Sequence, residues 1–142
     1  MKENYKNTCF KKIEEAEVYD VAIKSPLEFA KNLSKRLGNK IFLKREDLQP
    51  VFSFKLRGAY NKISKLIKAK KIKKLVAASA GNHAQGVALA AKKLSIKACI
   101  VMPKSTPEIK IEAVKSLKAE VILYGDSYDD AYDYALKKSK SS

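Results

Sequence analysis

Three short, unbroken apolar runs constrain the fold of this 142-residue chain more than any other feature. They occupy residues 75–78, 98–102 and 121–124. A strand without polar alternation suits a parallel sheet that is covered on both faces. Segments in which apolar residues recur at helical spacing separate the runs. This alternation predicts an α/β fold with an open, mostly parallel, twisted sheet and flanking helices.

Helices are expected before and between these strands. One begins after Ser53, a candidate N-cap, and its apolar stripe extends to Ile67. Another begins with Thr106 as the N-cap and Pro107 at the first helical position, and runs to about residue 117. The remaining expected elements are a helix over 26–37 that Gly38 stops, a strand over 40–44, a helix over 84–94, and a last helix with acidic residues near its start.

The composition limits the class of protein. The formal charge of +15 comes from 27 lysines spread over the whole chain and only 3 arginines, whereas nucleic-acid readers rely on the bidentate fork of arginine. No apolar run approaches the roughly 20 residues that span a bilayer, and the N-terminus lacks the apolar segment of a signal peptide. Cys9 and Cys99 belong to no CxxC pattern, so we expect both to stay reduced. The sequence therefore predicts a cytoplasmic protein with no nucleic-acid and no membrane partner.

The first chemical motif is Val-Phe-Ser-Phe-Lys-Leu-Arg-Gly-Ala-Tyr-Asn at residues 51–61. It places Lys55 between Phe54 and Leu56 at the start of an expected helix. Burial and the positive end of the helix dipole both disfavour an ammonium ion, so we expect a lowered pKa for Lys55. A lysine of this kind forms Schiff bases with carbonyl compounds or pyridoxal phosphate. We expect Arg57 to support the fold by pairing with a carboxylate.

The second motif, Ala-Ser-Ala-Gly-Asn-His-Ala-Gln-Gly at residues 78–86, joins an expected strand to an expected helix. Open α/β sheets bind ligands beyond the carboxyl ends of their strands. Free backbone N–H groups at the helix N-terminus suit an anion such as a carboxylate, and Gly81 lets the backbone approach it. Taken alone, this turn is more simply explained as a helix cap, because its spacing matches neither the dinucleotide-binding nor the phosphate-loop pattern.

Together the two motifs closely resemble those of the threonine dehydratases, which are fold-type II pyridoxal-phosphate enzymes. The resemblance includes Leu-Lys-Arg-Glu-Asp-Leu-Gln-Pro at residues 43–50 and extends from Val18 to about Leu136. The sequence of residues 44–50 is more similar to the biosynthetic branch than to the catabolic one. The resemblance implies deamination of L-threonine, or of L-serine, with pyridoxal 5'-phosphate as the cofactor. With threonine the products would be 2-oxobutanoate and ammonia, in the first step of isoleucine biosynthesis.

The resemblance also implies roles for single residues. Lys55 matches the lysine that holds the cofactor as a Schiff base and then moves the α-proton of the substrate. Asn82 matches the asparagine that hydrogen-bonds the phenolic oxygen of the cofactor ring, and Phe54 matches an aromatic residue beside that ring. We interpret His83, the only histidine, as a loop-positioning residue rather than a catalytic base, and expect no metal site. The loop that would hold the substrate carboxylate consists of Ser79, Ala80, Gly81, Asn82 and His83.

The same resemblance implies a division of the chain. Residues 1–45 would form an N-terminal arm that packs on a large domain, and residues 46–142 a small α/β domain that carries Lys55. The family holds the cofactor phosphate with a glycine-rich loop in a later part of the chain, and this sequence contains no glycine-rich run. We therefore expect an N-terminal portion of a longer, homo-oligomeric enzyme. In this polypeptide alone Lys55 would face solvent, and activity would be nearly absent.

Two other functions stay open. One is another fold-type II enzyme, such as a serine dehydratase, a serine racemase or a β-replacing enzyme like cysteine synthase. The Ser-Ala-Gly-Asn-His-Ala-Gln loop favours a dehydratase over the last of these, because β-replacing relatives usually have a Thr-Ser-Gly-Asn-Thr type of loop. The other is a non-catalytic basic module that binds nucleic acid or an acidic partner, which salt-dependent retention on DNA would favour.

Overall fold

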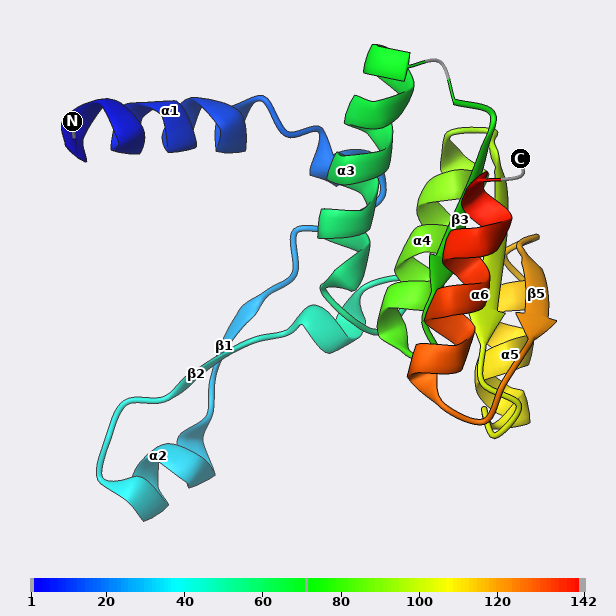
Figure 1. Ribbon diagram of the computed structural model, residues 1–142. Helices are drawn as coiled ribbons and strands as arrows, with labels where there is room; N and C mark the ends of the chain where they lie inside the picture. Colours follow the sequence, from blue (N-terminus) through cyan, green and yellow to red (C-terminus); the bar gives the residue numbers. More distant parts are fainter. Residues whose placement is uncertain (1, 71, 141–142) are drawn as a thin grey trace.

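The centre of the molecule is a three-stranded parallel sheet (Figure 1). The computed structural model describes residues 2–70 and 72–140, with side chains from residue 6 onward. The register pairs Val76 with Cys99 and Val101 with Ile122. The expected open, parallel α/β sheet is therefore confirmed. In spatial order its strands are β3 (Lys74–Ala78), β4 (Lys97–Met102) and β5 (Glu120–Leu123).

Helices cover both faces of the sheet because the side chains of its central strand alternate between two cores. Ala98, Ile100 and Met102 of β4 belong to the core formed with α4 and α5, whereas Val101 packs with α6. All four are buried, which explains the unbroken apolar run. The flanking helices are α3 (Lys55–Lys70), α4 (Asn82–Lys93), α5 (Glu108–Lys115) and α6 (Tyr128–Lys140).

A glycine allows α3 to pack closely along α4. A Cβ atom built on Gly86 of α4 would lie 3.0 Å from the backbone N of Leu56 and 3.0 Å from the backbone C of Lys55. Only a hydrogen atom fits between the two helices at this position. The first turn of α3 is therefore held directly against the first half of α4.

The segment before α3 consists of one longer helix, α1 (Lys2–Glu14), followed by short elements, and part of it projects from the sheet (Figure 1). An antiparallel pair of strands with a helix between them forms this extension. The rings of Phe29 and Phe42 lie 5.3 Å apart within it, yet both side chains are exposed. The extension therefore presents apolar surface to solvent. The elements are α1 (Lys2–Glu14), η1 (Val18–Asp20), β1 (Leu27–Phe29), α2 (Lys31–Leu37), β2 (Phe42–Lys44) and η2 (Glu46–Leu48).

Two expected helix starts are wrong. The helix expected over 26–37 begins only at Lys31, because residues 27–29 pair with β2 as a strand. The expected stop is confirmed, since Gly38 ends α2 in the left-handed conformation with φ 63°. Thr106 is not the N-cap of α5, since its hydroxyl donates to the carbonyl oxygen of Pro103 at 2.7 Å and the helix begins two residues later. In both cases a contact outside the helix overrides the local spacing.

Candidate functional site

Lys55 is the first residue of α3, and its side chain is exposed. Its backbone N–H donates weakly to Oγ of Ser53 at 3.4 Å. Its Nζ lies 5.0 Å from the centre of the Phe54 ring, which is a cation–π contact with a side chain that is 57% exposed. Of the two apolar neighbours of Lys55, only Leu56 enters the core, so these neighbours do not bury the lysine. The expectation that Lys55 faces solvent in this polypeptide is confirmed.

The loop after β3 presents backbone donors at the start of α4. The N–H of Ser79 donates to the carbonyl oxygen of Val101 at 3.1 Å, and the N–H of Gly81 donates to Oγ of Ser79 at 3.3 Å. Among the described residues, the backbone N–H groups of Asn82 and His83 at the first two helical positions have no hydrogen-bond acceptor. Such groups attract an anion. The loop therefore has donors of the kind predicted for binding a carboxylate.

The packing of α3 on α4 brings Lys55 and this loop into one region. Gly86, which touches the Lys55 backbone, lies about one helical turn after Asn82. Partial desolvation and the nearby Lys55 charge lower the pKa of the His83 imidazole. His83 is therefore biased toward its neutral form, by desolvation first and by the lysine charge second. The loop residues Ser79, Ala80 and Gly81 are half-buried, whereas Asn82 and His83 are exposed.

A polar network close to Lys55 in the chain was only partly predicted. Arg57 donates to Glu46 from Nε at 2.8 Å and from Nη2 at 3.0 Å, so the expected pairing of Arg57 with a carboxylate is confirmed. The hydrogen bond from Arg57 is the main reason that the pKa of Glu46 falls to about 2. Gln49 is also in this network and is 1% exposed. Nothing in the sequence distinguishes Gln49 from a surface glutamine.

The Glu46–Arg57 pair is expected to stabilise the fold near neutral pH and to lose this contribution in acid. The unfolded state takes up a proton on Glu46 near pH 4.5, whereas the folded state does so only near pH 2, so the contribution is lost between these values. Urea unfolding at pH 7 and at pH 3 measures this loss. From pH 7 to pH 3, we expect the free energy of unfolding to fall by about 1 kcal/mol less in Glu46→Gln than in the unchanged chain, after allowance for solvent screening. Equal losses in the two chains would contradict this expectation.

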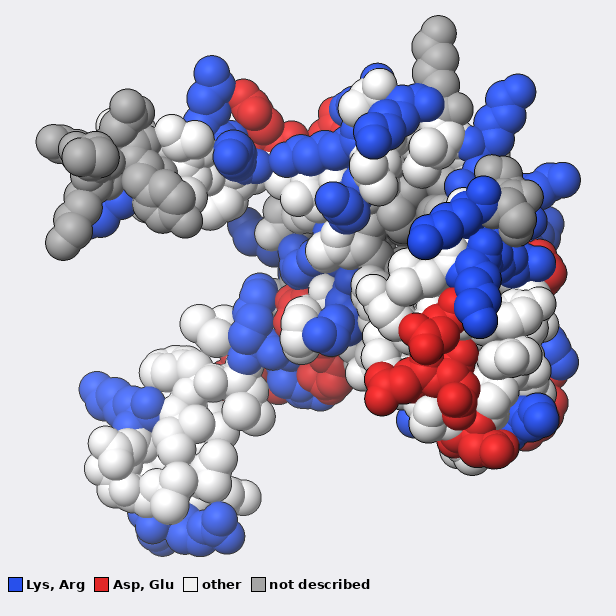
Figure 2. Space-filling model, in the orientation of Figure 1, with Lys and Arg blue, Asp and Glu red and all other residues white. Residues whose placement is uncertain are grey.

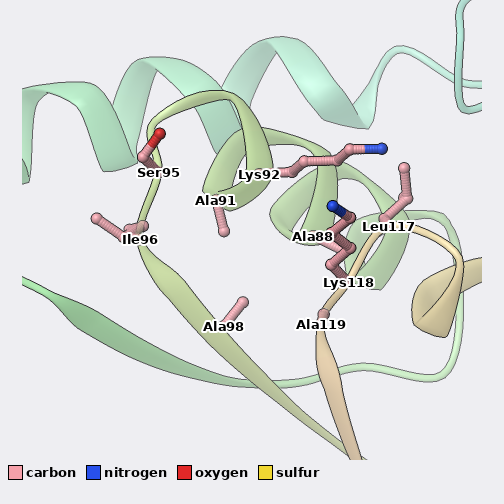
Figure 3. Close-up of a pocket in the computed structure, with 9 residues that line it drawn as sticks. All are labelled: Ala88, Ala91, Lys92, Ser95, Ile96, Ala98, Leu117, Lys118 and Ala119. Carbon is pink, nitrogen blue, oxygen red and sulfur yellow. The ribbon is translucent and has the colours of Figure 1, made fainter.

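A cavity of about 400 Å³ lies at the amino ends of β4 and β5, away from the loop that follows the carboxyl end of β3 (Figure 3). Its lining comes from the end of α4 and from the approaches to β4 and β5, and includes Lys92, Ser95, Ala98 and Lys118. None of the predicted site residues lines it. Open α/β sheets bind ligands at the carboxyl ends of their strands, whereas this cavity lies at the amino ends of β4 and β5.

Comparison with known proteins gives the chain a family. Residues 18–142 match the model of a family described as pyridoxal-phosphate dependent enzyme. The biosynthetic, chloroplastic threonine dehydratase of Arabidopsis thaliana is 64% identical over 118 residues, which are 83% of this chain and 20% of that protein. The biosynthetic L-threonine dehydratase of Pasteurella multocida is 54% identical over 126 residues, which are 89% of this chain and 25% of that protein.

Solved structures agree with the sequence comparisons. The processed form of threonine deaminase isoform 2 from Solanum lycopersicum superposes with a TM-score of 0.86 at 55% identity, over 92% of this chain and 36% of that chain. Maize serine racemase superposes with a TM-score of 0.85 at 32% identity, over 92% of this chain and 40% of that chain. The chain thus spans about a fifth to a quarter of the length of the curated relatives named above.

Proposed function

The chain belongs to the pyridoxal-phosphate-dependent enzyme family, and on that premise we propose that it carries the cofactor lysine of a biosynthetic threonine dehydratase. The complete reaction would convert L-threonine, or L-serine, into a 2-oxo acid and ammonia. The main structural support is the exposed amine of Lys55, whose backbone is held against α4 at Gly86, one turn after the loop that offers free N–H groups.

The described side chains fit the cofactor, pyridoxal 5'-phosphate, by their chemistry. Lys55 offers an exposed primary amine for covalent attachment to the cofactor aldehyde. Phe54 offers a ring that is free to lie beside the cofactor ring, and Asn82 an exposed amide for hydrogen bonding to its phenolic oxygen. When bound, the cofactor supplies an electron sink for the charge left at the substrate α-carbon.

The residues of the chain would then act on the substrate directly. The backbone N–H groups of Asn82 and His83 would bind its carboxylate, with Ser79, Ala80 and Gly81 completing the loop around it. The free amine of Lys55 would take the proton from the α-carbon, which requires Nζ to lie within hydrogen-bond distance of that proton. His83, whose lowered pKa favours the neutral imidazole, would position the loop rather than act as the base.

The wider setting of this site is also part of the proposal. Residues 1–45 would pack on a large domain, residues 46–142 would form the small domain, and the complete enzyme would be a homo-oligomer. We propose a cytoplasmic location with neither a membrane nor a nucleic-acid partner. In its support, both cysteines are free, and no helix of the described residues is long and apolar enough to cross a bilayer. Lys and Arg side chains lie on the extension and the sheet domain alike, without one dominant patch on the visible face (Figure 2).

Serine racemization is the second candidate. The maize serine racemase superposes almost as well as the tomato deaminase, so the fold alone does not separate the two activities. Sequence identity favours the dehydratase, at 55% against 32%. A hybrid enzyme in which residues 18–142 replace the matching segment of the Arabidopsis enzyme separates the candidates when it is supplied with L-serine, because only a racemase would form D-serine from it.

A hybrid enzyme tests the proposal. In this hybrid, residues 18–142 of the chain replace the matching segment of the Arabidopsis enzyme. We expect the hybrid to release 2-oxobutanoate from threonine, and the 142-residue chain alone to release none, because Lys55 and Phe54 face solvent in it. A folded hybrid without activity would contradict the proposal. Clear turnover by the chain alone, lost in Lys55→Ala, would contradict the expectation that the chain is inactive by itself.

A further inference from the structure

Two segments before α3 are joined to its first turn by polar side chains. Oγ of Ser25 donates to Oε1 of Glu46 at 2.6 Å, and Arg57 donates to both oxygens of the same carboxylate. Gln49 receives the N–H of Ile23 at 2.9 Å and donates to the carbonyl oxygen of Ile23 at 2.8 Å. Arg57 also donates to that carbonyl oxygen at 3.2 Å. Residues 23–25, residues 46–49 and Arg57 therefore share one hydrogen-bonded network.

This network is too enclosed to be an ordinary surface ion pair. The side chains of Arg57 and Glu46 are 24% and 18% exposed, and Ser25 and Gln49 are almost fully buried. Solvent screens such a pair less than an exposed one, and the bidentate geometry fixes the angle of the guanidinium. The described residues contain no buried side-chain polar atom without a hydrogen-bond partner, so the network is complete. A complete network specifies one arrangement, whereas a broken one leaves buried groups unpaired.

The backbone of Lys55 is restrained by its neighbours while its side chain stays free. Leu56 is buried in a small apolar cluster with Ala22 and Val51. Arg57 is tied to Glu46, and Gly86 abuts the backbone of Lys55. The chain enters this turn through Phe52, a bulky residue in the left-handed region with φ 53°, which needs surrounding contacts to hold it.

We propose that Glu46 and Arg57 are positioning residues for Lys55, and that their ion pair holds the first turn of α3 in register with α4 and the loop after β3. This inference rests on the proposed function, which supplies the reason for Lys55 to be fixed. Without the pair, only Leu56 and the Gly86 contact would hold the turn, and the backbone position from which the Lys55 side chain extends would vary. The amine would then spend less time where a cofactor aldehyde or a substrate α-proton can reach it.

Amide hydrogen exchange by NMR on the whole 142-residue chain tests the positioning role without any activity. In Glu46→Gln we expect the amides of residues 57–60 to exchange at least about tenfold faster, while those of β4 change less than about twofold. The nuclear Overhauser effect between Lys55 and Gly86 should weaken in parallel. Glu46→Asp keeps the carboxylate and should lose less protection. Arg57→Lys cannot form both bonds and should resemble Glu46→Gln.

Glu112→Gln is the matched control, because it removes an ion pair with Lys115 that has the same 2.8 Å distance but is exposed. It should leave residues 57–60 unchanged. Unchanged protection of residues 57–60 in Glu46→Gln would overturn the proposal. An equal loss of protection in β4, or a failure to fold, would also overturn it, because either result would assign the pair to overall stability. The hybrid enzyme tests the proposed function separately, so a failure of one inference is distinguishable from a failure of the other.

Discussion

Replacing Lys55 with alanine is expected to abolish threonine deamination by the hybrid enzyme, with a loss of at least about 1,000-fold in kcat. The variant removes both the amine that would bind the cofactor and the base that would move the α-proton. Because the side chain is exposed, its removal should leave the fold intact. Lys55→Arg should be equally inactive, since it keeps the positive charge but has no amine that can be deprotonated. The measurement is 2-oxobutanoate release, with circular dichroism to confirm folding.

Lys62→Ala provides the control within the same helix. Lys62 is exposed and lies seven residues after Lys55, so the two side chains share one face of α3. Its removal is expected to change kcat less than about twofold. Comparable losses in the two variants would mean that α3 needs surface lysines in general, and would remove the special role given to Lys55.

Alanine is expected to have opposite effects at two helical glycines. At Gly86 the added Cβ meets the backbone of α3 at 3.0 Å, and backbone atoms cannot rotate away, so we expect a loss of about 2 kcal/mol in the free energy of unfolding. At Gly58 no atom lies within 4 Å of the added Cβ. Alanine there should stabilise the chain by up to about 1 kcal/mol through its better helix propensity.

Urea unfolding of the two variants measures this difference, which should be about 3 kcal/mol. The measurement also tests the geometry of the site, because the Gly86 contact is what brings Lys55 and the loop after β3 together. If both substitutions stabilise the chain, α3 does not pack on α4 as closely as described here.

The sheet and the long helices could be predicted from the sequence because their signals are local. The apolar runs at β3, β4 and β5 are strands, and the stripe from Leu56 to Ile67 lies on α3. The small strand β1 could not be predicted in this way, since the apolar spacing of residues 26–37 suits a helix throughout. Its pairing with β2, some fifteen residues later, decides the conformation of residues 27–29.

The candidate site was predicted in its residues but not in its environment. The resemblance of the two motifs to a known family pointed to Lys55 and the loop at 79–83, whose roles stay predictions. The structure brings Gly86 against Lys55 as a consequence of helix packing. The exposure of Lys55 depends on the parts of the fold that pack around it. Its two apolar neighbours in the sequence, Phe54 and Leu56, do not determine that packing. Gln49 was missed because its burial arises from the path of residues 23–25, and a single glutamine carries no signal of that path.

Peptide mapping of the cofactor attachment site directly tests the proposal that Lys55 binds the cofactor. The hybrid enzyme would be loaded with pyridoxal 5'-phosphate, reduced with borohydride so that the covalent link becomes permanent, digested, and analysed by mass spectrometry. We expect a single labelled peptide, with the label on Lys55. A label on another lysine, or one spread over many lysines of the hybrid, would contradict the assignment of Lys55.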